Sequence, residues 1–169
     1  LTYSLLRAEA SQGTPPQQAL LNVNRTLMAL NSASMFVTIL CGVLDCKQGN
    51  FSFARAGHPA PLVLTSSGEL IKIPLNRSHA IGLFEEIAVD AQSFPVPKGG
   101  LILIYSDGLS EASNEVGEQF GEAELGNFLG TYRHHHPQEI CEGLWLAVQR
   151  FCGEQPQQDD FTVVAIKSK

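Results

Sequence analysis

The stretch LILIYSDG occupies residues 101–108, and the stretch QDDFTVVAI occupies residues 158–166. Each one combines an apolar run, typical of a buried β-strand, with an acidic turn at one end of that strand. Strand ends hold side chains rigidly, and carboxylate oxygens are the ligands that hard cations such as Mg²⁺ and Mn²⁺ prefer. Together the two stretches predict a metal-dependent enzyme more than a binding module.

Each acidic turn also has a simpler interpretation. Asp107-Gly108 after an apolar strand is a common hairpin or loop signal, and Asp159-Asp160 before a strand can be a pair of solvated carboxylates. Short motifs often match by chance, so neither turn alone decides between these interpretations. The pair is more specific than either member.

Composition places limits on the class of protein. A chain of 169 residues with 44% hydrophobic and 17% charged residues is typical of a globular protein, and we expect one domain over residues 1–169. The net charge of -6, without a Lys/Arg run, argues against nucleic acid or an anionic membrane surface as a partner. No apolar run approaches eighteen residues, so we expect no direct membrane binding.

Four cysteines are present without a Cys-x-x-Cys pair, which argues against a zinc cluster or a redox dithiol. Cysteines of this kind are typically small, reduced hydrophobic residues in a cytoplasmic protein. We therefore expect a cytoplasmic location.

The periodicity of apolar residues predicts two helices, then a run of strands, then helices and a final strand. Helices are predicted at 1–10 and 15–31, the second opened by the start signal Thr14-Pro15-Pro16. Strands are predicted, as a meander of antiparallel hairpins, at 36–45, 50–56, 61–65, 69–73, 87–94 and 100–106.

After Asp107 the sequence predicts a loop, then helices near 121–129 and at 137–152. The final strand, 161–167, is nearly continuous apolar sequence and is expected deep in a sheet. Such an order predicts the α+β class, with helices outside two antiparallel sheets.

Several stretches together resemble one family, and they cover the chain from about Ser4 onward. They are FVTILCGVLD at 36–45, AGHPAPLVL at 56–64, IGL at 81–83, YSDGLSEA at 105–112 and DDFT at 159–162. In this order they resemble the SpoIIE-type, sigma-factor-regulating branch of the metal-dependent (PPM, type 2C) serine/threonine protein phosphatases. The resemblance implies an α-β-β-α sandwich, with a site for two Mn²⁺ or Mg²⁺ ions at one end.

The resemblance also implies roles for single residues. Asp107 and Asp159 correspond to ligands of one metal ion, and Gly108 leaves space beside it. Asp160 is expected to support the site, either by capping the loop or by forming a hydrogen bond to a metal-bound water. The hydroxyl of Thr162 is expected to fix the turn. Glu111 also matches a family position, but an exposed loop residue explains it equally well.

One family motif does not occur in this sequence. Members of the family carry an Asp-x-x-Gly-x-Gly motif whose Asp bridges two metal ions, and the opening stretch, residues 1–10, resembles the helix after that motif. We therefore expect the chain to be the C-terminal part of a longer protein, without the first strands of the fold. We also expect it to hold at most one metal ion, weakly. The sheet edge that the missing strand would leave exposed favours self-association, as a dimer, or a domain-swapped contact.

Two histidine-containing segments invite catalytic or metal-binding interpretations. His58 in AGHP could act as a general acid, but a strand-end turn in which Gly57 takes an unusual backbone angle is the favoured interpretation, because no acidic partner is identifiable. The run at 134–136 is three consecutive histidines, which rarely converge on one tetrahedral site. We expect a solvated loop between helices there.

The function that the resemblance implies is a metal-dependent protein serine/threonine phosphatase acting through a metal-activated water. Its expected substrate is a phosphorylated anti-anti-sigma (STAS-domain) protein, and its expected controller is an upstream sensory or receiver domain. The alternative is a catalytically degenerate phosphatase fold, in a response regulator, that binds a sigma factor or its regulator. The missing motif favours the alternative, whereas the pair of uncompensated carboxylates, Asp107 and Asp159, favours the enzyme.

Overall fold

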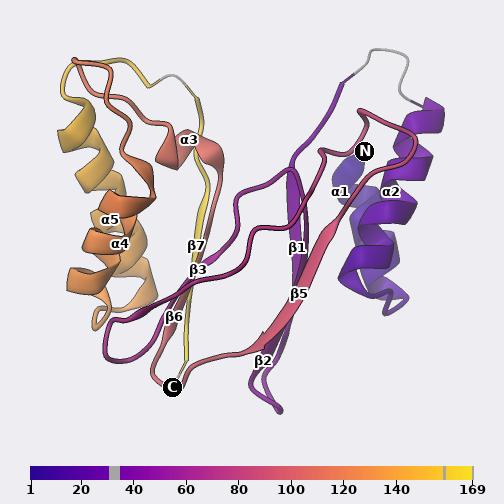
Figure 1. Cartoon of the computed structure of the whole chain (residues 1–169), viewed down its shortest axis with the longest axis horizontal. Helices are drawn as coiled ribbons and strands as arrows, with labels where there is room; N and C mark the ends of the chain where they lie inside the picture. Colours follow the sequence, from indigo (N-terminus) through magenta and orange to yellow (C-terminus); the bar gives the residue numbers. More distant parts are fainter. Residues whose placement is uncertain (31–34, 158, 169) are drawn as a thin grey trace. The chain divides into compact units, whose positions relative to one another are not determined.

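The computed structural model describes residues 1–30, 35–157 and 159–168. The chain forms two compact units (Figure 1). The N-terminal unit comprises Leu1–Ala60 and Pro74–Pro95, and the C-terminal unit comprises Pro61–Ile73 and Val96–Lys169. Among the described residues, no helix combines the length and apolar character that crossing a membrane requires.

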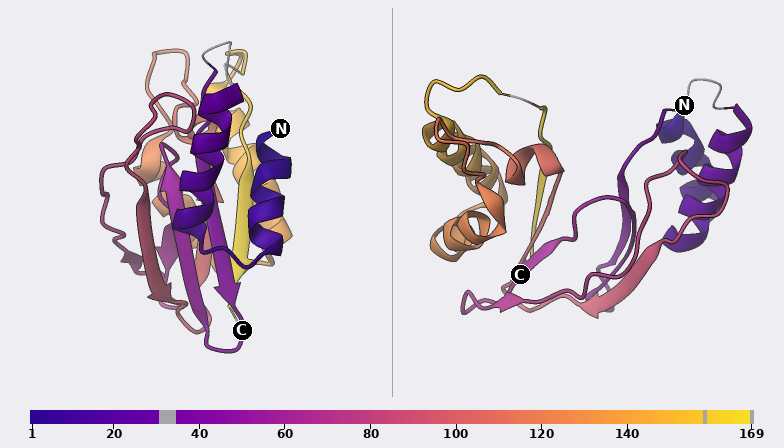
Figure 2. Two further views of the ribbon diagram at one scale, coloured as in Figure 1. Left: turned by 90° about the vertical axis from the view of Figure 1, so that its right-hand side faces the viewer. Right: turned by 45° about the horizontal axis from the view of Figure 1, so that its top comes forward.

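The N-terminal unit is a three-stranded antiparallel sheet with two helices. Its elements are α1 (Thr2–Ser11), α2 (Pro16–Leu30), β1 (Ile39–Asp45), β2 (Asn50–Ala56) and β5 (Asp90–Pro95). The strand order is β1-β2-β5, with α1 and α2 on one side of the sheet (Figure 2). Leu20 and Val23 of α2 are buried against Ala54 and Ala56 of β2, as helical and strand periodicity require.

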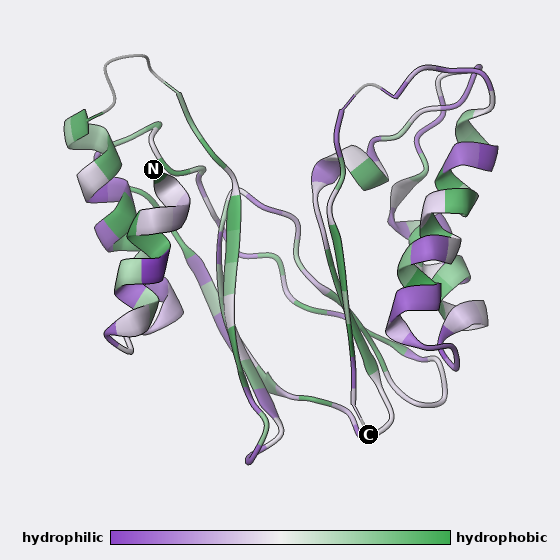
Figure 3. Cartoon of the chain, turned by 180° about the vertical axis from the view of Figure 1, so that it is seen from behind, coloured by the Kyte–Doolittle hydropathy of each residue, from purple (hydrophilic) through white to green (hydrophobic). Residues whose placement is uncertain are grey.

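The C-terminal unit is a four-stranded antiparallel sheet with three helices. Its strands are β3 (Leu62–Leu64), β4 (Leu70–Ile71), β6 (Leu101–Tyr105) and β7 (Val163–Lys167), in the order β4-β3-β6-β7. Its helices are α3 (Asp107–Ser110), α4 (Gly121–Tyr132) and α5 (Pro137–Cys152). Green and purple alternate along these helices in Figure 3, which marks them as amphipathic.

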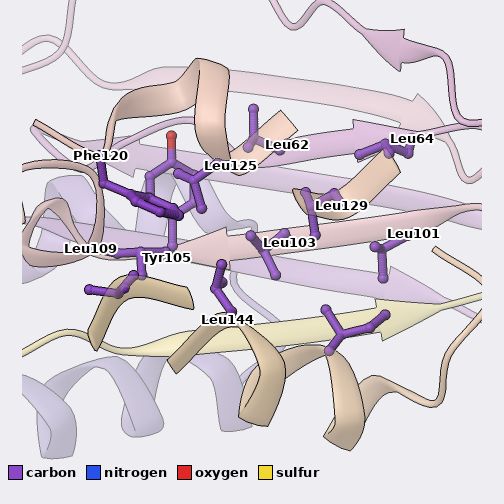
Figure 4. Packing of buried hydrophobic residues seen from close by; sticks show 12 residues of the cluster. Leu62, Leu64, Leu101, Leu103, Tyr105, Leu109, Phe120, Leu125, Leu129 and Leu144 are labelled. Atoms are coloured by element: carbon purple, nitrogen blue, oxygen red, sulfur yellow. The ribbon is translucent and has the colours of Figure 1, made fainter. Parts of the chain in front are cut away.

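The core of the C-terminal unit explains why β6 is so apolar. Leu101, Leu103 and Tyr105 alternate along β6 and lie on one side of it, where they meet Leu125 of α4 and Leu144 of α5 (Figure 4). Each of these five residues is at most 2% exposed. This packing fixes the end of β6, and therefore the start of the acidic turn that follows.

The structure confirms the α+β class, with two antiparallel sheets and accompanying helices, and most predicted elements. The predicted hairpins β1-β2 and β3-β4 are confirmed, but a continuous meander through all six strands is wrong, because the strands divide between two sheets. After β2 the chain adds β3 and β4 to the second sheet, returns for β5, and then enters the second sheet again at β6. Long-range pairing decides this division, and local sequence carries no record of it.

Two further predictions about the C-terminal unit are corrected. The predicted loop after Asp107 begins with the four-residue helix α3, closed by the Glu111 N–H donating to the Asp107 carbonyl at 2.8 Å, and it is irregular only from residue 111 to residue 120. The last strand, β7, is not deep in a sheet, because it pairs with β6 alone at the edge and leaves Val164 46% exposed. A short apolar run therefore did not require neighbours on both sides.

The N-terminal unit contains a buried ion pair. Arg55 Nε donates to Asp90 Oδ2 at 2.8 Å, and Asn76 and Gln92 donate to the same carboxylate. Burial alone would raise the pKa of Asp90, but hydrogen bonds from Asn76, Gln92 and Arg55 together lower it. The network joins β2, β5 and the segment between β4 and β5.

A buried amide holds a second part of this unit together. The Asn24 side chain of α2 is 2% exposed and accepts a hydrogen bond from the Gly82 N–H at 2.9 Å. Its amide nitrogen donates to the carbonyls of Phe84 and Glu85. The IGL stretch is therefore attached to α2, because only a fully hydrogen-bonded amide is tolerated at such a depth.

Candidate metal site

The two acidic segments lie at neighbouring ends of paired strands. Tyr105 of β6 is the register partner of Val163 of β7. One step further, the Thr162 N–H donates to Ser106 Oγ at 2.9 Å, and the Ser106 N–H donates to the Thr162 carbonyl at 3.1 Å. The pairing therefore continues past the strands and brings the segment before Thr162 alongside Asp107.

Gly108 is the point of closest approach between the segments. A Cβ atom on this residue would lie 2.6 Å from the Asp160 carbonyl oxygen and 3.5 Å from the Asp159 Cβ. Real Cβ atoms essentially never come within 3.0 Å of another atom. The close approach therefore requires glycine, which supports the expectation that Gly108 leaves space beside the acidic pair.

Both candidate ligands are held through local backbone contacts. Asp107 Oδ1 accepts from the Gly108 N–H at 3.1 Å, and Asp159 Oδ1 accepts from the Asp160 N–H at 2.8 Å. Within the described ranges, the one ion pair formed is Arg55–Asp90, so neither carboxylate is neutralised by a basic side chain. Two uncompensated carboxylates on neighbouring segments are compatible with a bound cation.

The donor chemistry fits a hard cation, although the group is small. Carboxylate oxygens match Mn²⁺ and Mg²⁺ better than softer metals. Residues 1–30, 35–157 and 159–168 contain no group of three or more His, Cys, Asp or Glu side chains placed to hold an ion together. Asp107 and Asp159 are therefore two candidate ligands, and a metal site that used them would need further oxygen ligands.

The neighbouring residues differ from expectation in their contacts. The Asp160 N–H donates a hydrogen bond to Asp159 Oδ1, and the Asp160 carbonyl oxygen is the atom that approaches Gly108 most closely. Thr162 contacts Ser106 through its backbone, whereas the sequence predicted a contact through its hydroxyl. Glu111 is exposed and ends α3. Sequence reasoning missed Ser106, although its position directly before Asp107 is a signal that could have found it.

His58 belongs to the N-terminal unit, whereas Asp107 and Asp159 belong to the C-terminal unit. Gly57 adopts the unusual backbone angle that was predicted, with φ of 71°, and a Cβ there would lie 2.9 Å from the Ala80 nitrogen. The His58 ring lies 3.5 Å from Thr38 Oγ1. These contacts describe a strand-end turn, which is the structural interpretation favoured above.

The histidine run joins α4 to α5, as predicted. His136 caps α5: its Nδ1 accepts from the Gln138 N–H, and the Glu139 carboxylate accepts from the His136 N–H at 2.8 Å. The ring of His135 lies 4.9 Å from that of Tyr132. Capping and ring packing therefore account for two of the three histidines.

Comparison with known sequences identifies relatives of this chain. It is 29% identical over 134 residues to "Protein IcfG" of Synechocystis, covering 79% of this chain and 21% of that protein. It is 23% identical over 157 residues to "Phosphoserine phosphatase RsbU" of Bacillus subtilis, covering 93% of this chain and 46% of that protein. The chain thus spans less than half the length of either relative.

Solved structures share its fold. The RsbU and RsbW domains of Rv1364c from Mycobacterium tuberculosis match with a TM-score of 0.81 and 26% identity, over 98% of this chain and 45% of that one. The SiaA-PP2C domain of Pseudomonas aeruginosa matches with a TM-score of 0.85 and 21% identity, over 100% of this chain and 68% of that one. The manganese-presoaked phosphatase domain of SpoIIE from Bacillus subtilis matches with a TM-score of 0.70 and 21% identity, over 99% and 73%.

The family assignment extends over the whole sequence. The family model described as "Stage II sporulation protein E (SpoIIE)" matches residues 1–169. The family that the sequence motifs indicated is therefore confirmed. The chain belongs to the SpoIIE family, whose fold is that of PP2C-type phosphatase domains.

Proposed function

We propose that this domain is a Mn²⁺- or Mg²⁺-dependent protein phosphatase that hydrolyses phosphoserine or phosphothreonine. The observation that carries the proposal is the close approach of the segments that contain Asp107 and Asp159, at the joined ends of β6 and β7, around a glycine that leaves no room for a side chain. Family membership and the name of the relative "Phosphoserine phosphatase RsbU" support the same reaction.

In this proposal Asp107 and Asp159 supply carboxylate oxygens to one ion, and Ser106 and Gly108 hold the two segments at the required separation. When bound, such ions neutralise phosphoryl oxygens and lower the pKa of a coordinated water. Rigid positioning of the carboxylates matters because the ion must be held in one place while charge develops on the phosphoryl group. Further oxygen ligands complete the site.

We further propose that the substrate is a phosphorylated anti-anti-sigma protein of the STAS class. Support comes from two relatives: the phosphatase RsbU, and a solved chain in which RsbU and RsbW domains occur together. The substrate proposal depends on the reaction proposal but is narrower than it.

The direct test incubates the full-length protein and Mn²⁺ with a phosphorylated STAS protein and, separately, with a phosphoserine peptide. Release of phosphate from both supports both proposals. Hydrolysis of the peptide but not of the STAS protein would contradict the substrate proposal and still support the phosphatase reaction. If a control phosphatase cleaves both substrates while this protein cleaves neither, the reaction is wrong and a binding module is favoured.

A further inference from the structure

A cavity of about 250 Å³ lies beside the acidic segments, inside the C-terminal unit. Trp145, Val148 and Cys152 of α5 form one wall, and Phe161 contributes another apolar surface. Gly108 and Asp159 also line it. The cavity therefore adjoins the candidate metal site, and its wall on α5 consists of residues that the proposed reaction does not use.

The apolar wall includes an aromatic residue that the fold does not fully bury. Trp145 is 40% exposed, and its ring lies 5.3 Å from that of Phe161, inclined at 43°. Phe161 follows Asp160 directly, so the aromatic pair is attached to the acidic turn itself. Partly exposed tryptophan beside a pocket is typical of binding hot spots, because it offers a large apolar surface with few rotatable bonds.

We propose that this cavity binds an apolar side chain of the phosphoprotein, close to the phosphorylated residue, and thereby selects the substrate. The proposal rests on the phosphatase function proposed above. A side chain that enters beside Asp159 and Gly108 would place the neighbouring phosphoryl group near the carboxylates. The cavity is thus a specificity pocket formed by α5 and the acidic turn.

The properties of the cavity favour this occupant over others. Its volume is below the range of about 300–1,000 Å³ that is typical of pockets for whole small-molecule ligands, so a single side chain fits it better than a nucleotide. The described residues that line it include the carboxylates Glu111 and Asp159 and no lysine or arginine, which disfavours the phosphoryl group itself. The aromatic and aliphatic wall suits a leucine or phenylalanine side chain.

The kinetic test uses the full-length protein with Mn²⁺ and phosphoserine peptides in which leucine replaces alanine at one flanking position at a time. If the cavity buries a leucine side chain, leucine at one flanking position should raise kcat/KM by a factor of about ten or more relative to the all-alanine peptide. Trp145→Ala removes the wall, and Gln149→Trp adds bulk from an exposed position that lines the cavity. In both variants the ratio of kcat/KM for the leucine peptide to kcat/KM for the alanine peptide is expected to fall below about three, because the leucine side chain is no longer buried.

Leu146→Ala is the matched control, because Leu146 is the next residue of α5, is 48% exposed and does not line the cavity. This variant is expected to keep the wild-type preference. Equal kcat/KM for all peptides in the wild type would overturn the proposal. So would a preference that survives in both Trp145→Ala and Gln149→Trp.

A second readout does not depend on catalysis. Cys152 lines the cavity, and burial raises the pKa of its thiol. Alkylation of this thiol by iodoacetamide is expected to be slow and is followed by mass spectrometry near pH 8.5. In EDTA, an unphosphorylated leucine peptide is expected to slow alkylation of Cys152 but not of the exposed Cys46, and the alanine peptide to slow neither.

The two readouts separate this proposal from the proposed function. If the leucine peptide protects Cys152 but no peptide is hydrolysed, the proposed phosphatase activity is wrong and the proposed side-chain pocket is supported. Hydrolysis of all peptides at equal kcat/KM, without protection of Cys152, would overturn the pocket and retain the phosphatase.

Discussion

Ser106 and Thr162 are joined by reciprocal hydrogen bonds, in which the Thr162 N–H donates to Ser106 Oγ at 2.9 Å and the Ser106 N–H donates to the Thr162 carbonyl at 3.1 Å. One bond uses the serine side chain, so this link depends on residue identity as well as on backbone pairing. Ser106 lies directly before Asp107, and Thr162 lies three residues after Asp159. The link therefore sets the separation of the two candidate ligands.

Replacing Ser106 by alanine is expected to weaken the metal site more than the fold. The lost bond is partly solvent-exposed, so the free energy of unfolding should fall by only about 0.5–1 kcal/mol, as measured by urea denaturation. Manganese affinity of the full-length protein, measured by calorimetry, should fall several-fold because the carboxylates are held less rigidly. Ser67→Ala, in the turn before β4, is the control. Equal affinities in the two variants would contradict a positioning role for Ser106.

Gly108→Ala is expected to be destabilising because the added methyl group would lie 2.6 Å from the Asp160 carbonyl oxygen. Forcing the segments apart should cost about 1–3 kcal/mol of unfolding free energy and strongly reduce manganese binding. The matched control is Gly126→Ala in α4, where a Cβ would meet nothing within 4 Å. That change should stabilise the protein by about 0.5–1 kcal/mol, because alanine favours helix over glycine. Thermal unfolding of both variants distinguishes these outcomes, and a stable, manganese-binding Gly108→Ala protein would refute the close approach.

Much of this architecture could be predicted from sequence, for identifiable physical reasons. Helix α5 has a Pro start, a capping residue and Ile140, Leu144 and Val148 at helical spacing, and all of these signals are local. The division of strands between two sheets and the edge position of β7 depend on long-range pairing. Asp107, Asp159 and Gly108 were found as a motif, whereas the role of Ser106 required its hydrogen bond across the turn to be seen.

The Arg55–Asp90 pair predicts a specific dependence of stability on pH. The pKa of Asp90 is lower in the folded protein than the ordinary aspartate value of about 3.9, so the folded state binds this proton less readily than the unfolded state. The stabilisation is therefore fully present above about pH 4 and is lost as pH falls through the lower, folded-state pKa. Urea denaturation at pH values from about 4 downward should show that the wild type loses more unfolding free energy than Asp90→Asn, because the variant has no carboxylate at position 90 to protonate.

At neutral pH, Asp90→Asn should destabilise the protein by about 3 kcal/mol or more, because Arg55 remains buried without its counter-charge. An unchanged neutral-pH stability would show that solvent reaches Arg55 and that the pair contributes little.

Asn24→Leu should destabilise the N-terminal unit by about 2–3 kcal/mol, although leucine is apolar and of similar size. The change leaves the Gly82 N–H and the carbonyls of Phe84 and Glu85 without their side-chain partner. Asn22→Leu, at a partly exposed position two residues earlier on α2, should cost less than about 1 kcal/mol. Similar losses in the two variants, by thermal or urea unfolding, would count against a special role for Asn24.

The roles of Asp107 and Asp159 as metal ligands are tested most directly by manganese-dependent hydrolysis of a phosphoserine peptide. The proteins compared are the full-length wild type and its Asp107→Asn, Asp159→Asn and Asp45→Asn variants. Asp45 caps a turn in the N-terminal unit by accepting hydrogen bonds from Lys47 and Gln48, which asparagine can also accept. Activity is expected in the wild type and in Asp45→Asn, with at least roughly a hundredfold loss of kcat in the other two variants, because each of them removes a group that stabilises charge in the transition state. Wild-type activity that persists in either Asp107→Asn or Asp159→Asn would contradict the assignment of that residue as a metal ligand.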